Sequence, residues 1–411
     1  MKRIYFDHSA TTPVDKPVLK AMLPYFTTKF GNASSLHTYG QEGMLAVDQS
    51  RATVAKFLNC DPSEIIFTSG ATEANNLALF GVIKRLQSMG MNKPHIITSE
   101  IEHEAILEPC HELERQGVEV SYAKVKSNGV VDLEHLKSLI KENTVLISVM
   151  YVNSEVGAVQ PIREIGKIIK KINEHRLNDW NNTKPEKRGL KPQEIYLHTD
   201  ATQAINFFNC DVAWNYIDLL SFSGHKIYGP KGIGALYVRK GVTLSGIQLG
   251  GHHENNKRSG TLNVTGIVGM AAAIAQLQNK NHIKENAKIA KLRDMLVKGV
   301  LKNIDHAILN TDIPNATPSH AHFSFLGVEG ESILISLDLE GIAVSTGSAC
   351  AAGSLKPSHV LLAMGIKQEV AHNSIRFTLG KYNTAEEIRR VIKVLPPIIK
   401  KFRKFSPLKL V

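Results

Sequence analysis

The chain has 411 residues, 43% hydrophobic and 21% charged, so it can bury a full core and should form one large and one small domain. Its 49 basic and 38 acidic residues give a net charge of +11, which favours acidic partners, but no aromatic and basic RNA motif accompanies it, and direct nucleic-acid binding is not expected. With no apolar run near the ~20 residues that span a bilayer and only four unpaired cysteines, we expect a cytoplasmic protein without membrane contact.

Strand and helix patterns alternate from about residue 16 to 260, which predicts a large domain with a mostly parallel sheet covered by helices. Residues 1–15 should return to a smaller domain or line the cleft beside it. Together with residues 261–411 they would make up this smaller α+β domain. The predicted fold class is therefore α/β.

The first motif is the segment 65–76, Ile-Ile-Phe-Thr-Ser-Gly-Ala-Thr-Glu-Ala-Asn-Asn, which predicts a strand, a glycine turn and a helix start. Ser69 or Thr72 could cap the helix, and Gly70 would allow a backbone conformation that other residues avoid. The free N–H groups and the dipole of a helix N-terminus favour an anion such as a phosphate. An ordinary capped helix is the alternative, because the glycine spacing matches no nucleotide-binding fingerprint.

His103 follows a second apolar run, residues 95–98. An imidazole at a strand end could stack on a pyridine ring or exchange protons near neutral pH. Metal binding is the alternative, since Cys110 and His111 follow. Their spacing fits no helical ligand pair, and no metal site is predicted.

Asp200 follows the apolar run 195–198, and Lys226 stands in Ser-Gly-His-Lys between the runs 217–222 and 232–238. These short runs predict strands of a covered sheet, and ligands of such sheets bind outside the strand ends, where both side chains can converge. The pair suits pyridoxal phosphate, because a lysine forms an imine with the aldehyde and a carboxylate keeps the ring nitrogen protonated. Further candidate phosphate donors flank the lysine: Ser223 and His225.

Residues 284–304 carry apolar side chains at helical spacing, which predicts a helix packed in the core of the smaller domain. Downstream, Cys350 lies among small residues in a segment, about 345–357, that predicts a mobile loop with an exposed thiol. The other cysteines are expected to be free and buried: Cys60, Cys110 and Cys210.

Over nearly the whole chain these motifs resemble the cysteine desulfurases of the NifS/IscS type, in the class V aminotransferase family. The resemblance rests on the segments already quoted and on Arg258-Ser259-Gly260-Thr261. It implies a pyridoxal-phosphate-dependent transferase of fold type I and a homodimer. The Cys350 segment resembles the branch with the long cysteine loop.

The resemblance also implies roles for single residues. Around the cofactor ring these are Lys226 (covalent link), Asp200 (pyridinium nitrogen), Gln203 (phenolic oxygen) and His103 (stacking). The phosphate would be held by Ala71, Thr72, Ser223 and His225, with Thr261 supplied by the neighbouring subunit. Asn153 and Arg376 would bind the substrate carboxylate, a task for which the planar fork of arginine is suited. A surface arginine on a strand is the alternative for Arg376.

The implied reaction converts L-cysteine to L-alanine and leaves a persulfide on Cys350. The catalytic residues would be Lys226, His103 and Cys350, with no metal apart from a transient iron–sulfur or sulfur transfer at Cys350. An extended chain spans ~3.3 to 3.6 Å per residue, so the thiol could carry sulfur over roughly 16 Å to an acceptor. Acceptors would serve iron–sulfur cluster assembly, thio-cofactor synthesis or tRNA thiolation.

Two departures from the family pattern stand out. Residues 176–194 form a polar stretch longer than the expected connection between helix and strand. Residues 405–408 resemble the start of a tail that docks iron–sulfur scaffolds, but this tail is short. A selenocysteine lyase, an aminotransferase or a non-catalytic binding relative remain alternatives, and Cys350 argues against transamination, which needs no thiol.

Overall fold

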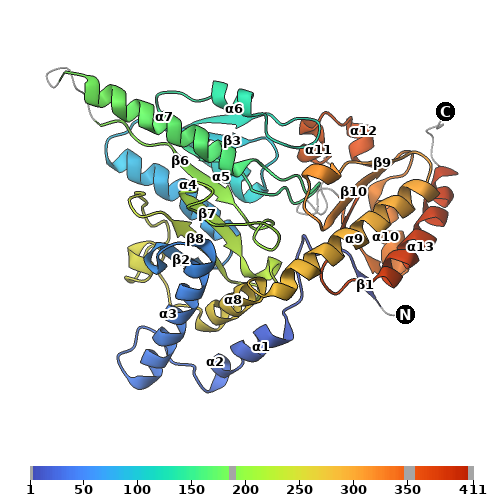
Figure 1. Ribbon diagram of the computed structural model, residues 1–411, viewed down its shortest axis with the longest axis horizontal. Helices are drawn as coiled ribbons and strands as arrows, with labels where there is room; N and C mark the ends of the chain where they lie inside the picture. Colours follow the sequence, from blue (N-terminus) through green and yellow to red (C-terminus); the bar gives the residue numbers. More distant parts are fainter. Residues whose placement is uncertain (1–2, 185–190, 347–356, 406–411) are drawn as a thin grey trace.

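The computed structural model describes residues 3–184, 191–346 and 357–405, and it has the predicted α/β architecture (Figure 1). The larger part is built around a seven-stranded sheet with the order β2-β8-β7-β6-β5-β3-β4. Its strands are β2 (Ile65–Thr68), β3 (His95–Ser99), β4 (Glu119–Ala123), β5 (Thr144–Ser148), β6 (Tyr196–Asp200), β7 (Leu219–Ser223) and β8 (Gly234–Val238). Only β8 is antiparallel to its neighbours, β7 and β2, which confirms the mostly parallel sheet.

Helices cover both faces of this sheet. Successive side chains of a strand point to opposite faces, so that Ile65 joins one apolar cluster and Ile66 the other. One face packs against α4 (Ala71–Ser88) and α5 (Glu104–Arg115). The other packs against α1 (Lys16–Met22), α3 (Thr38–Leu58), α6 (Leu133–Ser138), α7 (Ile162–Asn182) and α8 (Val264–Leu277), and α2 (Pro24–Thr27) links α1 to α3.

The smaller part has its own apolar core. An antiparallel sheet of β9 (Ala307–Leu309), β10 (His320–Phe325) and β12 (Ser374–Thr378) lies beside a parallel pair of β1 (Ile4–Tyr5) and β11 (Ile342–Ala343). Its helices are α9 (Lys280–Asn303), α10 (Gly330–Leu339), α11 (His359–Ala363), α12 (Gln368–Ala371) and α13 (Ala385–Arg403). The predicted core helix is α9, which buries Ile289, Leu296 and Val300. Near the N-terminus, Ile4 and Phe6 also lie in this core.

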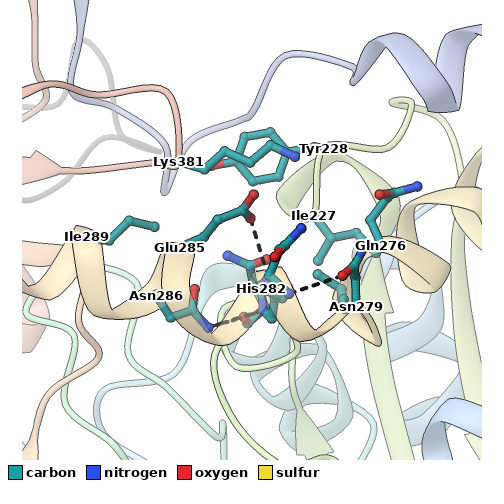
Figure 2. A pocket seen from close by; sticks show the side chains of 12 residues that line it. Ile227, Tyr228, Gln276, Asn279, His282, Glu285, Asn286, Ile289 and Lys381 are labelled. Carbon is teal, nitrogen blue, oxygen red and sulfur yellow. Dashed lines mark hydrogen bonds and ion pairs between the residues drawn. The ribbon is translucent and has the colours of Figure 1, made fainter.

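The junction between the two parts lies at α8 and α9, where Figure 1 shows α9 leading from the end of α8 into the smaller part. Because Ile267, Met270 and Ile274 of α8 pack in the core of the larger part, we propose a domain boundary after α8 rather than at residue 261. A cavity of about 140 Å³ lies at this junction. Figure 2 shows side chains that line it, among them His282, Glu285 and Asn286 of α9. There, His282 Nε2 lies 2.6 Å from the carbonyl oxygen of Asn206.

The polar stretch 176–194 is not a loop throughout, because α7 continues to Asn182. Arg176 holds this end of the helix to the sheet, since its guanidinium donates to the carbonyl oxygens of Thr144 and Gln193 at 3.2 and 3.3 Å. No helix in the described part of the chain is long and apolar enough to cross a membrane.

Candidate active site

A cavity of about 560 Å³ opens at the ends of β6 and β7 and at the start of α4. The structure brings together here most of the residues singled out in the sequence. They are Ala71, Thr72, His103, Asp200, Gln203, Ser223, His225, Lys226 and Arg376. The predicted convergence of Lys226 and Asp200 outside the strand ends is therefore present.

Lys226 ends a short 3₁₀ turn after β7 and reaches the N-terminal segment of the chain. Its Nζ donates to the carbonyl oxygens of Ser9 and Ala10, the latter at 2.7 Å. Gln203 donates to the same carbonyl of Ser9 at 2.9 Å. The sequence had placed residues 1–15 near the cleft without naming Ser9 or Ala10.

Asp200 is the last residue of β6 and is 7% exposed. Its carboxylate accepts hydrogen bonds from Asn75 Nδ2 at 2.7 Å and from the backbone N–H of Thr202 at 2.9 Å. These two donors fix the orientation of the carboxylate. The sequence analysis gave no role to Asn75, which is fully buried in α4. Its position among apolar residues of the predicted helix is the signal that could have found it.

The phosphate-binding prediction centres on the start of α4. Its N-cap is Gly70, and no side chain caps the helix, so the predicted capping by Ser69 or Thr72 is wrong. Ser69 instead donates its backbone N–H to Glu73 at 2.7 Å. Because the first N–H groups of a helix have no intrahelical partner, the uncapped end offers donors to an anion.

Gly70 is not required for its backbone angles, since its φ of 161° is extended backbone. A side chain here would meet only Ser223 Oγ, at 3.6 Å, so the glycine leaves space open above the helix start. It is Gly234 of β8 that must be a glycine for steric reasons, because a Cβ there would lie 2.6 Å from the carbonyl carbon of Gly70. The turn therefore fits a phosphate group.

An ion pair neutralises the carboxylate of Glu73 beside this helix start. Burial alone would raise the pKa of Glu73, but hydrogen bonds from Arg258 and Ser69 outweigh it and hold the pKa below its usual value. Arg258 Nε donates to Glu73 Oε1 at 2.7 Å. The pairing limits the repulsion between this carboxylate and a bound phosphate.

The two histidines of the cavity have different partners. His103 caps α5, and its Nδ1 accepts the backbone N–H of Ala105 at 3.0 Å, so a neutral ring carries its proton on Nε2. His225 Nδ1 lies 3.2 Å from Thr11 Oγ1. Burial and then the charges of Lys226 and Lys231 lower the pKa of His225 to about 4, so it is a neutral side chain at pH 7.

Glu102, which precedes His103, is a fully buried carboxyl that the sequence did not reveal. It accepts hydrogen bonds from Ser99 Oγ at 2.5 Å and from the backbone N–H of Met150 at 2.9 Å. Burial raises its pKa to about 8, and nearby Asp200 adds to the rise. Glu102 thus ties the turn that carries His103 to the segment after β5.

Arg376 lies on β12 and is 3% exposed, so the alternative of a surface arginine is wrong. Its Nη1 donates to the carbonyl oxygen of Ser154 at 2.9 Å and its Nη2 to Asp7 Oδ1 at 2.8 Å. Its Nε is buried without a partner in the described structure. The guanidinium of this cavity residue therefore has one N–H that is not engaged by the described protein groups.

Three predicted site residues are not among those brought together. Asn153 is 1% exposed and does not line the cavity, because its amide donates to the carbonyl of Ile101 and accepts from Glu155 and Val156. Thr261 is exposed and does not line the cavity of its own chain. Cys350 lies outside the described residues.

The remaining cysteines are free. Cys110 and Cys210 are buried as predicted, but Cys60 is only half-buried, which corrects that prediction. Burial raises the pKa of Cys60 to about 12 and that of Cys210 to about 12, so neither forms a thiolate at neutral pH. Within the described ranges there is no group of three or more His, Cys, Asp or Glu side chains that could hold a metal.

Comparisons with known proteins agree with the geometry. The family model for class V aminotransferases matches residues 4–179 and 180–391. The chain is 46% identical to the cysteine desulfurase IscS of Dictyoglomus turgidum, with 100% of this chain and 98% of that protein covered. Among solved structures, a NifS-like protein has a TM-score of 0.84 at 37% identity, covering 98% of this chain and 99% of that one. The structure of SspA in complex with cysteine has a TM-score of 0.77 at 34% identity, covering 93% of this chain and 100% of that one.

Proposed function

Since the chain belongs to the class V aminotransferases and, within them, to the cysteine desulfurases, we propose a role for each residue of the cavity in converting L-cysteine to L-alanine. The enzyme is pyridoxal-phosphate-dependent. The observation that carries the assignment is the convergence of Lys226, Asp200 and Arg376 on one cavity. A lysine, a carboxylate and an arginine are what the cofactor aldehyde, its ring nitrogen and a substrate carboxylate require.

Each part of the cofactor has a matching group in the cavity. Lys226 would hold its aldehyde carbon and Asp200 its protonated ring nitrogen, with His103 over the ring and Gln203 at the phenolic oxygen. The phosphate would take the N-terminus of α4 at Ala71 and Thr72, together with Ser223 and His225. When bound, the cofactor withdraws electrons from the bonds of an amine-linked substrate.

The chain itself supplies the remaining chemistry. Lys226, once displaced by the substrate amine, would move protons at the substrate carbon, and Arg376 would hold the carboxylate. A thiolate of Cys350 would attack the substrate sulfur, so that an S–S bond forms and the Cβ–S bond breaks. The electron pair left on carbon takes up a proton, and the products are alanine and a persulfide on Cys350.

Arg376→Lys tests the substrate assignment. Lysine keeps the positive charge near Asp7 but loses the fork, so we expect the KM for L-cysteine to rise roughly ten- to hundred-fold, the loss of one charged hydrogen bond of ~1.5 to 3 kcal/mol. Alanine release against cysteine concentration measures the change. The matched control is Arg293→Lys, at a buried arginine of the smaller part that does not line the cavity. An unchanged KM in Arg376→Lys would remove the residue from the substrate site.

We also propose a homodimer. A row of apolar side chains on α1, α2, the start of α3 and their links is exposed: Leu19, Leu23, Phe26, Phe30, Leu36, Tyr39, Met44 and Leu45. Ser34 Oγ lies 3.1 Å from His253 Nε2, so this surface adjoins the segment that leads to Thr261. A second copy covering this surface would bring the exposed Thr261 toward its partner's cavity.

Thr261→Ala is expected to weaken pyridoxal phosphate retention roughly ten- to hundred-fold, because one hydrogen bond to a charged phosphate is worth ~1.5 to 3 kcal/mol. Equilibrium dialysis of the cofactor measures the loss, and the circular dichroism spectrum should stay unchanged.

Mixing this variant with Lys226→Ala subunits identifies which chain supplies Thr261. In a mixed dimer one site would then carry both defects and the other none, so activity per intact lysine should rise above that of Thr261→Ala alone. No rise on mixing, or a fully active monomer by sedimentation, would contradict the shared site.

The persulfide sulfur would pass to an acceptor protein in the cytoplasm. The candidate acceptors are those of iron–sulfur cluster assembly, thio-cofactor synthesis or tRNA thiolation. An iron–sulfur scaffold stays a prediction from residues 405–408, of which only Phe405 is among the described residues.

A further inference from the structure

Glu155 is a buried carboxyl that none of the roles above uses. It is 7% exposed and lies after β5, two residues beyond Asn153, which accepts its backbone N–H at 2.9 Å. Its Oε2 accepts a hydrogen bond from Ser358 Oγ at 2.5 Å. Burial raises the pKa of Glu155, while Ser358, His359, Arg376 and His103 act in the opposite direction. Burying a carboxyl group costs folding free energy unless hydrogen bonds compensate for the lost water. The bond from Ser358 therefore stabilises Glu155 in its buried position.

Ser358 is the N-cap of α11, and its hydroxyl is both a hydrogen-bond donor and an acceptor. Its Oγ accepts the backbone N–H of Leu361 at 3.2 Å while it donates to Glu155. The next residue, His359, adds a second link, with Nε2 2.9 Å from the carbonyl oxygen of Glu102. The hydroxyl therefore couples the start of the helix to the carboxyl.

Apolar packing holds the same helix to the larger part of the molecule. Val360 and Leu361 of α11 lie in one buried cluster with Ile101, Met150 and Val156. Helix α11 thus packs against the loops that carry Glu102 and Glu155 in the larger part. In the sequence, however, α11 follows β11 of the smaller part.

The chain segment that contains Cys350 therefore runs between two anchors. At its start, Ser345 pairs with Arg376, with Arg376 N–H donating to Ser345 at 2.7 Å and Ser345 N–H donating back at 3.2 Å. At its end, Ser358 is held by Glu155.

We propose that Glu155 is a positioning residue for sulfur transfer, acting through Ser358 to fix the point at which the chain returns from Cys350. The inference rests on the proposed role of Cys350 as the thiol that takes the substrate sulfur. Without the contact, the start of α11 loses one of the hydrogen bonds that hold Ser358 in place. Orientation of this kind affects the transfer step and leaves substrate binding at Arg376 intact.

A double-mutant cycle tests the coupling. Glu155→Ala and Ser358→Ala are each expected to slow persulfide formation on Cys350 roughly ten-fold. The double variant should be slowed by less than the product of the two effects, because either single variant already removes the shared contact, while Ser358→Ala also removes the cap on Leu361. The readout is mass spectrometry of Cys350 in a single turnover with L-cysteine. The absorbance change on adding cysteine should stay as in the wild type. Ser358→Thr keeps the hydroxyl and should restore the rate.

Hydrogen exchange supplies a readout that does not depend on turnover. The amides of residues 359–364 should exchange faster in Glu155→Ala and Ser358→Ala but not in Ser358→Thr. Ser358→Ala removes a single hydroxyl, so the test stands even if Glu155→Ala does not fold.

Unchanged persulfide rates in the single variants, or independent effects that multiply in the double variant, would overturn the inference alone. A wild-type enzyme that forms no persulfide on Cys350 would overturn the proposed function as well, so the two failures are distinguishable.

Discussion

Lys226→Ala is expected to lose covalent attachment of pyridoxal phosphate and to reduce alanine formation by at least the ~10² to 10⁴-fold typical of a lost general acid–base group. Lys226 lines the cavity and donates to the carbonyl oxygens of Ser9 and Ala10, and Asp200 lines the same cavity. Borohydride reduction followed by mass spectrometry should find the cofactor fixed to the wild-type chain and absent from the variant.

Lys231→Ala is the matched control, since Lys231 lines the same cavity but is exposed and has no role in the proposed chemistry. This variant should retain both the fixed cofactor and its visible absorption band. If reduction still fixed the cofactor to Lys226→Ala, the lysine assignment would have to be given up.

Cys350→Ala is expected to abolish persulfide formation and sulfide release under reducing conditions. Cofactor binding and the absorbance change on adding L-cysteine should persist, because the thiol acts only after the substrate is bound. Sulfide and alanine assays measure the loss, and titration with cysteine measures the retained binding.

Cys60→Ala serves as the control, because Cys60 is the half-buried cysteine whose raised pKa makes it a poor nucleophile. It should keep wild-type turnover. Undiminished sulfide release by Cys350→Ala would redirect the function toward a lyase or an aminotransferase that needs no thiol.

Features confined to one stretch of chain were predictable. The apolar runs before Asp200 and on either side of Lys226 form β6, β7 and β8, and the amphipathic stripe from residue 284 forms part of α9. Their order along the chain sufficed to predict that Asp200 and Lys226 meet, because parallel strands end at the same edge of a sheet.

Predictions failed where a polar residue could bind more than one partner and the sequence did not show which partner it takes. The sequence around Gly70 offers Ser69 and Thr72 as caps, but Glu73 binds the Ser69 backbone instead and leaves the helix start uncapped. Likewise, residues 176–182 are mostly polar but remain helical in α7, where Arg176 binds the backbone of neighbouring segments. Polarity alone does not distinguish such a helix from a loop.

The sequence by itself determined the cofactor chemistry and the family, since both depend on which residues stand in each motif and in what order. Only the tertiary structure decided the contacts of Lys226 with Ser9, of Arg376 with Asp7 and of Ser358 with Glu155. Each joins residues more than 200 positions apart. Such pairs leave no local pattern in the sequence, because they form only when the fold brings distant segments of the chain together.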